Sequence, residues 1–235
     1  MKYPFILLLV LSSLSLGAQT PGQDSLQERY HQILHPSDAL MNGREYKFYF
    51  NPRGSSPLIP QDPLPSAFVL TREKEYQNVH LLYDTYKDLL LYHNPATLYN
   101  GMLITVIVNS NLIEEFTLQL PSGQARFRYL NFPENQEGLL NSGYYEVVSE
   151  GTCMYIIDHF SLKETQAGGV GYPYKTQGYL ILSGTAFKIM GKKSLLKALS
   201  DQPAKVNEYL KREKIRVRTA SKEQLKGLLE HYMKK

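Results

Sequence analysis

The candidates for nucleophilic chemistry in this 235-residue sequence are Cys153 and the adjacent pair Asp158 and His159. Nucleophilic catalysis needs a nucleophile, a base and a group that orients the base. Cys153 alternates with Tyr155 and Ile157 in a strand-like pattern, which predicts a buried and inert thiol. Adjacent strand residues point to opposite faces of a sheet, so we do not expect Asp158 to orient His159. No G-x-S-x-G motif occurs, and we therefore assign no catalytic residue.

The sequence motifs that would bind a metal or a phosphate, or pair two carboxylates for catalysis, are incomplete. His31 and His35 share one face of a predicted helix, but no glutamate stands between them as the zinc-peptidase pattern requires. The segment 191–194 (GKKS) lacks the earlier glycine of a phosphate loop and the hydroxyl residue after its first lysine. Glu114 and Glu115 face apart on a predicted strand. We expect no metal site and no cofactor, although a constellation assembled from distant strands stays an alternative.

Tyrosine is unusually frequent, with 18 Tyr and no Trp in the sequence. Several tyrosines lie in or near a glycine-rich stretch at 168–171, and tyrosine supplies rigid, amphipathic contact area that suits binding. The possible binding surface that we single out consists of Tyr144, Tyr172, Tyr174 and Tyr179. The alternative is ordinary aromatic packing between neighbouring strands.

The net charge of +4 is unevenly distributed along the chain. Residues 192–235 carry thirteen Lys or Arg against five Asp or Glu, whereas residues 19–191 carry twelve against seventeen, so their net charges are +8 and −5. The basic segment would suit an acidic partner or lipid headgroups, with Lys211, Arg212 and Lys214 as its candidate contacts. The alternative is a solvated helix face. We expect no nucleic-acid partner, because the chain lacks strong overall basicity and any recognised nucleic-acid-binding motif.

Most of the predicted elements that position the candidate residues are β-strands. A hydrophobic fraction of 43% and a charged fraction of 20% are typical of a globular domain. Short links with turn residues separate the period-two segments, which predicts an antiparallel meander. A strand is also expected at 45–50, before a proline-rich loop at 51–66. The remaining predicted strands are 67–70, 78–84, 88–92, 102–109, 111–120, 125–132, 143–149, 153–162, 176–182 and 186–190.

Helices are expected near both ends of the chain. Residues 24–35 carry one apolar stripe, and the proline that follows would end this helix. After residue 191 the apolar residues return to helical spacing, with Pro203 suited to the first turn of one helix. Ser221 and Gln224 have the spacing of a capping box at the start of the last helix.

The first 18 residues are typical of a secretory signal peptide. Lys2 provides the positive charge, residues 5–16 the apolar stretch, and residues 16–18 (LGA) a small-residue cleavage site before Gln19. The apolar run is shorter than the roughly 20 residues that a membrane helix needs, so we expect no transmembrane segment in the mature chain. We therefore expect an exported protein that lies in the periplasm or is associated with the outer membrane. We expect a signal peptide at 1–18, a β body with an N-terminal helix at 19–191, and a basic helical segment at 192–235.

Several short stretches of this sequence are similar to stretches in a group of known proteins. They are 42–46 (NGREY), 83–84 with 88–89 (YD and DL), 192–196 with 209–211 (KKSLL and YLK), and the cleavage zone 16–19 (LGAQ). In these stretches the chain resembles exported proteins of Bacteroidota to which no activity is assigned. The resemblance spans most of the mature chain. It implies a location in the cell envelope and identifies no functional residue.

The sequence predicts a mainly β (α+β) protein, an antiparallel meander, curved sheet or partial barrel with an N-terminal helix and a C-terminal helical segment. We expect a non-enzymatic binding or accessory protein of the bacterial cell envelope, whose partner is an envelope protein or an acidic surface. One alternative is a lipid or hydrophobic-ligand carrier, because a curved sheet can enclose an apolar cavity. The other is a hydrolase with a site scattered over the sheet, which a cleft with convergent carboxylates or histidines would favour.

Overall fold

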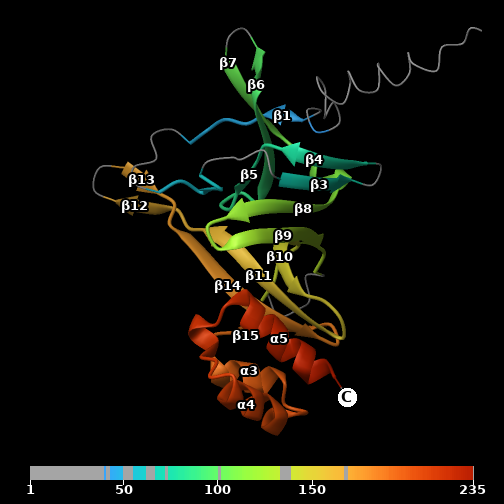
Figure 1. Ribbon diagram of the computed structural model, residues 1–235. Coiled ribbons are helices and arrows are strands. Elements are labelled where there is room, and N and C mark those ends of the chain that lie inside the picture. The colour runs from blue at the N-terminus through green and yellow to red at the C-terminus, as the bar shows by residue number, and fades with distance from the viewer. Residues whose placement is uncertain are drawn as a thin grey trace, which may run out of the picture. The chain divides into compact units, whose positions relative to one another are not determined.

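The computed structural model describes residues 40, 43–49, 55–61, 67–71, 74–99, 102–132, 139–166 and 169–234. The chain divides into two units, Met1–Asp38 and Ala39–Lys235. All described residues belong to the second unit (Figure 1). The predicted signal peptide and the predicted helix at 24–35 lie outside the described residues.

The prediction of a mainly β chain with antiparallel sheets is confirmed. The larger sheet has eight strands in the order β15-β14-β11-β10-β9-β8-β3-β4. Seven of these strands begin and end within two residues of a predicted strand, because alternating side chains between tight turns mark them in the sequence. They are β3 (Ala67–Thr71), β8 (Ile113–Leu120), β9 (Gly123–Leu130), β10 (Gly143–Ser149), β11 (Cys153–Ser161), β14 (Tyr174–Leu182) and β15 (Thr185–Ile189); the eighth is β4 (Glu75–Val79).

A second sheet has five strands in the order β1-β7-β6-β5-β2, so the predicted meander is divided between two sheets. The glycine-rich stretch is part of a separate two-stranded hairpin, β12 (Glu164–Gln166) and β13 (Gly169–Gly171). A 3-10 turn, η1 (Ser110–Leu112), leads from the second sheet back into β8. The five strands are β1 (Arg44–Glu45), β2 (Leu58–Ile59), β5 (Leu81–Asp84), β6 (Leu89–Tyr99) and β7 (Met102–Ile107).

The change of sheet falls inside a segment that the sequence predicts as one strand, 78–84. The structure has β4 at the edge of the larger sheet and β5 within the smaller one. Asn78 has a φ of 55°, in the left-handed region that asparagine tolerates better than most residues. Val79, Leu81 and Tyr83 keep a period of two across the junction of β4 and β5, which is why the sequence pattern alone does not show the break.

The predicted strand at 45–50 is also shorter than expected, because β1 ends at Glu45. The backbone N–H of Tyr46 still donates to the carbonyl of Thr105 (2.8 Å), and Tyr46 is buried as expected. Phe48, which should share the buried face, is 54% exposed. The hydroxyls of Tyr46 and Tyr49 both reach the Asp84 carboxylate, so polar contacts rather than strand alternation place this segment.

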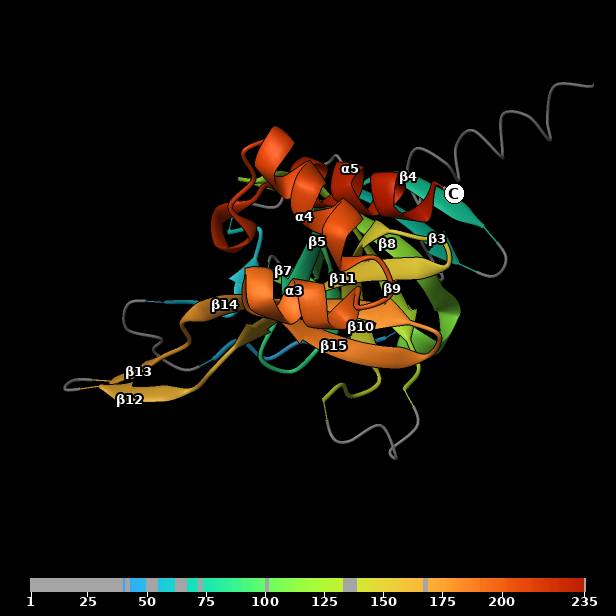
Figure 2. The ribbon, with the colours of Figure 1, turned by 90° about the horizontal axis from the view of Figure 1, so that it is seen from below.

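The C-terminal segment forms α3 (Lys192–Ala198), α4 (Pro203–Arg212), a 3-10 turn η2 (Val217–Thr219) and α5 (Lys222–Met233). Pro203 lies in the first turn of α4, as predicted. The capping box is also confirmed: the Gln224 N–H donates to the Ser221 hydroxyl (3.2 Å) and the Ser221 N–H donates to the Gln224 side chain (3.0 Å). The helices bury their leucines against β11, β14 and β15, and Figure 2 shows them over this end of the sheet.

Aromatic side chains fill the space between the two sheets. Phe116 and Phe127 are fully buried and stack at 4.9 Å between ring centroids. Tyr83 of β5 packs against both rings. Phe127 lies opposite Glu146 in the β9–β10 register, so Glu146 projects from this same face of the larger sheet.

The turn between β5 and β6 joins the two sheets by polar contacts. The Thr85 hydroxyl bonds to the carbonyl of Pro57 (2.7 Å) and to the hydroxyl of Ser161 on β11 (2.7 Å). The Thr85 N–H donates to the same Pro57 carbonyl (3.0 Å), and the Ser161 N–H donates to the Thr85 carbonyl (3.0 Å). This turn therefore fixes the segment that carries β2 relative to β11. In the part of the chain that the structure describes, no helix is long and apolar enough to cross a membrane.

Candidate functional site

The structure separates the four tyrosines that the sequence singles out as a binding surface. Tyr144, Tyr172 and Tyr179 are buried, with exposed fractions of 2%, 6% and 7%. Tyr144 packs in the core between the sheets, and Tyr172 packs against tyrosines of two other segments. Packing in the core accounts for these buried rings, and Tyr179 lies in a cluster with Leu140 and Ile156. Tyr174 is 43% exposed, so it is the residue of the four that offers contact area to a ligand.

The candidate basic contacts lie at the end of α4. Lys211, Arg212 and Lys214 are all exposed. The Arg212 guanidinium donates to the Glu213 carboxylate (2.8 Å) and lies over the Tyr209 ring, 5.0 Å from its centroid. Arg212 is therefore engaged locally, whereas the two lysines extend the basic surface.

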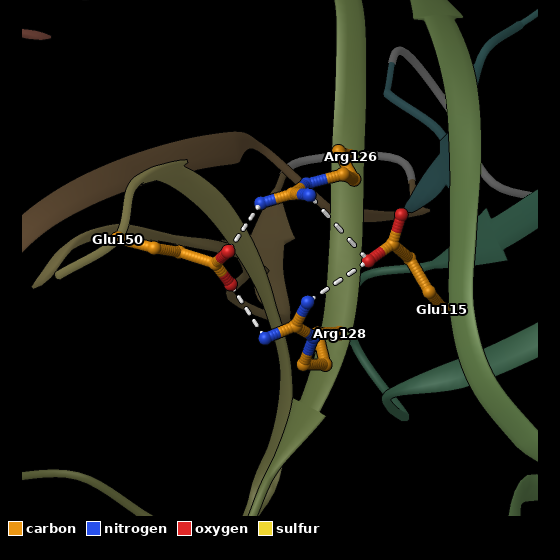
Figure 3. Close-up of polar contacts among 4 residues, drawn as sticks. All are labelled: Glu115, Arg126, Arg128 and Glu150. Carbon is orange, nitrogen blue, oxygen red and sulfur yellow. Dashed lines mark hydrogen bonds and ion pairs between the residues drawn. The ribbon is translucent and has the colours of Figure 1, made fainter.

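Charged side chains on the outer face of the larger sheet form a closed ring of two arginines and two glutamates (Figure 3). Arg128 contacts Glu115 at 3.1 Å and Glu150 at 2.5 Å. Arg126 contacts the same two carboxylates at 3.8 and 3.2 Å. The ring balances its own charge, and partly exposed ion pairs contribute little stability, typically about 0.2–1 kcal/mol each. We assign no ligand to it.

Cys153 is buried and Asp158 projects from the opposite face to His159, as the sequence predicts. Cys153 is fully buried, and burial together with the charge of Asp201 raises the pKa of its thiol to about 11. The predicted buried thiol is confirmed. No hydrogen bond joins Asp158 to His159, because the two project from opposite faces of β11. Burial raises the pKa of the Asp158 carboxyl to about 6.

His159 is the centre of a chain of four hydrogen-bonded side chains, which we call the relay. Its Nε2 lies 2.8 Å from the Glu146 carboxylate, and its Nδ1 lies 2.5 Å from the Tyr174 hydroxyl. The second carboxylate oxygen of Glu146 accepts from Lys222. Glu146 and His159 are each 3% exposed at their side chains, Lys222 is 22% exposed, and Tyr174 reaches the surface.

Four separate elements bring the relay together. Glu146 lies on β10 directly opposite Ile157, so His159, two residues further along β11, is its diagonal neighbour on the same face. Tyr174 begins β14 and is the diagonal neighbour of His159 on the other side. Lys222 is the first residue of α5, whose capping box starts the helix above β10.

The polar groups of the relay satisfy one another. Burial alone would raise the pKa of Glu146, but the hydrogen bonds from His159 and Lys222 outweigh it, so this pKa lies below its ordinary value. Burial and the charge of Glu146 raise the pKa of Tyr174 to about 12. The imidazole of His159 lies between these two groups, with Nε2 toward the Glu146 carboxylate and Nδ1 toward the Tyr174 hydroxyl. The relay therefore holds Tyr174 as a neutral, oriented ring.

Tyr174 also forms part of the wall of an open groove of about 680 Å³ at the junction of the two sheets. Its apolar floor includes Ile59 and Leu120, which are buried. Its rim is exposed and includes Gln61 and Gln119. The groove thus combines an apolar floor, a polar rim and one exposed aromatic ring that the relay orients. These are features of a binding site.

Sequence reasoning identified Tyr174 and missed Glu146, Lys222 and the groove. No group of three His, Cys, Asp or Glu within the described residues lies close enough to hold a metal ion, and His31 and His35 lie outside those residues. No family model, curated protein or solved structure matches this chain significantly.

Proposed function

We propose that this chain is an exported, non-enzymatic binding protein of the bacterial cell envelope, and that its groove receives an extended apolar segment of a partner protein. The observation that carries the proposal is the exposed ring of Tyr174, held by His159 beside an apolar floor. Aromatic anchors beside an apolar floor with a polar rim are typical of protein interfaces.

The position of β2 supports an extended ligand. β2 pairs with β5 on one side and is the edge strand of the smaller sheet. Both residues of β2, Leu58 and Ile59, line the groove. An extended peptide can add to such an edge through its backbone and place alternate side chains in the adjoining hollow.

The state of the relay argues against catalysis by these residues. Both ring nitrogens of His159 are engaged, and the imidazole is 3% exposed. The raised pKa of Tyr174 disfavours the phenolate that a nucleophile would need. The hydrolase alternative would therefore need a different set of residues.

The lipid-carrier alternative predicts a different cavity. A carrier with a curved sheet or partial barrel would enclose most of an apolar ligand. The groove found here is bordered by exposed residues, among them Pro121 and Ser122. This open form favours a protein segment over an acyl chain.

Tyr174→Ala is expected to weaken binding of an extended peptide by about thirtyfold, which corresponds to the roughly 2 kcal/mol that an interface tyrosine contributes. The measurement is the fluorescence anisotropy of a panel of short labelled peptides with alternating apolar residues, with labelled palmitate as a separate arm. Binding of palmitate alone would establish the carrier instead. Binding of neither probe would refute the proposed site.

Tyr129→Ala is the matched control, because Tyr129 is 42% exposed and does not line the groove. It should leave peptide binding unchanged within about twofold. Tyr174→Phe separates the ring from the hydroxyl. It should retain most of the affinity while losing about 1 kcal/mol of stability with the hydrogen bond to His159.

The proposed export is tested by the N-terminus of the protein in its native host. Cleavage before Gln19 should give an envelope-fraction protein whose sequence begins at Gln19 or within a few residues of it. N-terminal sequencing or intact-mass measurement reads this directly. An intact Met1 in that fraction would contradict the signal peptide.

A further inference from the structure

A second hollow, of about 500 Å³, lies where the larger sheet meets the C-terminal helices. The strands β11 and β14 contribute Tyr155 and Thr176 to its wall, and Arg218 and Lys222 come from η2 and α5. Within the described chain it shares no lining residue with the groove. Its lining includes Lys222, which the relay also uses.

Tyr155 presents to this hollow a hydroxyl donor that has no partner among the described residues. The residue is 7% exposed, and no described residue forms a hydrogen bond with its hydroxyl. A Cβ at Gly178, which lines the same wall, would lie 2.1 Å from that hydroxyl, so the hydroxyl lies directly over this glycine. Burial and the charge of Glu146 raise the pKa of Tyr155 to about 12, so the group stays a neutral donor. A ligand acceptor would satisfy it.

The wall of the hollow also has an excess of positive charge. Arg218 is exposed, and no described carboxylate pairs with it. Lys222 is balanced by Glu146, which is not among the lining residues. None of the described lining residues is Asp or Glu. The charge of the Arg218 guanidinium is therefore uncompensated, and its planar donors match a carboxylate or phosphate.

Apolar side chains complete the wall. Ile157, Ile189 and Leu225 line the hollow beside the polar groups. A free inorganic ion would leave this surface uncovered, whereas an apolar body attached to the anion would cover it. The volume lies within the range of small-molecule sites, about 300–1,000 Å³.

We propose that this hollow binds a small organic oxyanion, a carboxylate or a phosphate monoester, that carries an apolar body. Arg218 binds the oxyanion, the Tyr155 hydroxyl donates to it, and the apolar wall holds the body. The site is independent of the groove, so failure of either proposal leaves the other standing.

Isothermal titration calorimetry of the full mature chain with octanoate, octyl phosphate and octanol tests the site. At least one of the two anions should bind, and octanol should bind at least about tenfold more weakly because Arg218 gives it no charge-assisted bond. The two anion arms distinguish carboxylate from phosphate. Equal binding of octanol, or no binding of either anion, would overturn the proposal.

Two variants locate the site. Arg218→Gln should weaken anion binding by about tenfold or more. Arg216→Gln is the matched control, because Arg216 is exposed on the same segment and does not line the hollow. Equal losses in both variants would show general attraction to the basic segment and refute a defined site.

Tyr155→Phe gives a readout that a structural role would not produce. Because no described residue bonds to the Tyr155 hydroxyl, its removal should leave the thermal unfolding midpoint unchanged or raised. The same variant should weaken anion binding several-fold. A lower unfolding midpoint with unchanged binding would contradict the assignment.

Discussion

Replacing Glu146 with alanine is expected to lower the free energy of unfolding by about 3–5 kcal/mol, the loss typical of breaking a buried charge pair. The substitution leaves the buried Nε2 of His159 without its acceptor and deprives Lys222 of its anion. It also creates a cavity between β10, β11 and α5. Urea unfolding followed by circular dichroism measures the change.

Glu164→Ala is the matched control for this prediction. Glu164 is 45% exposed at its side chain and contacts Lys175 at 3.6 Å, so its removal should cost less than about 1 kcal/mol. Similar losses in the two variants would mean that the relay adds nothing beyond an ordinary surface pair.

The acid limb of the stability curve gives a second readout for Glu146. Its pKa lies below its ordinary value of 4.5 in the folded protein. The stability that the ionised carboxylate provides is therefore complete above that ordinary value and is lost as the pH falls through the lowered pKa. Glu146→Ala should remove this part of the pH dependence and leave the rest.

Local patterns account for the elements that the sequence predicts correctly. β8 and β9 alternate buried and exposed side chains over part of their length, β10 and β11 are rich in β-branched and aromatic residues, and turn residues lie between most of these strands. The capping residues Ser221 and Gln224 act within four positions of each other, so their interaction needs no tertiary information. Such short-range patterns specify a strand or a helix start without information from the rest of the fold.

The relay depends on contacts between distant positions, which local patterns do not specify. His159 attracts attention in the sequence beside Asp158, yet its partners are Glu146, Tyr174 and Lys222. The Glu146 contact does not follow from the turn at 150–151, because the register of β10 and β11 shifts between Val147 and Ser149. The Lys222 contact depends on how α5 packs.

Neither the groove nor the division into two sheets could be predicted from the sequence, for a related reason. Both depend on where the chain passes from β4 to β5 and on how the segment with β2 docks. Val79, Leu81 and Tyr83 keep a period of two across the first point, and the second lies in a proline-rich stretch that gives few structural signals. Polar contacts of the turn between β5 and β6 hold the segment that carries β2 in place.

Asp84 directly precedes Thr85 in this turn, and Asp84→Ala is expected to destabilise the protein by about 3 kcal/mol or more. The residue is fully buried, and its carboxylate accepts four hydrogen bonds. Tyr46 and Tyr49 donate their hydroxyls at 2.8 and 2.6 Å, and the backbone N–H groups of Tyr86 and Lys87 donate at 3.0 and 3.1 Å. Alanine leaves these donors without an acceptor, and urea unfolding measures the loss.

The same substitution should also impair the groove, because Asp84 pairs with Leu58 of β2 and the next residue, Thr85, holds the Pro57 carbonyl. Peptide binding should therefore fall in Asp84→Ala even under conditions where the variant is still folded. Asp201→Ala is the matched control: Asp201 is exposed and accepts from Tyr232 at 2.7 Å, so its loss should cost about 1 kcal/mol and leave binding intact. Asp84→Asn keeps the shape of the side chain and one acceptor oxygen, so it should lie between alanine and the native residue in both measurements. A folded Asp84→Ala variant with native peptide affinity would show that the turn does not position the groove.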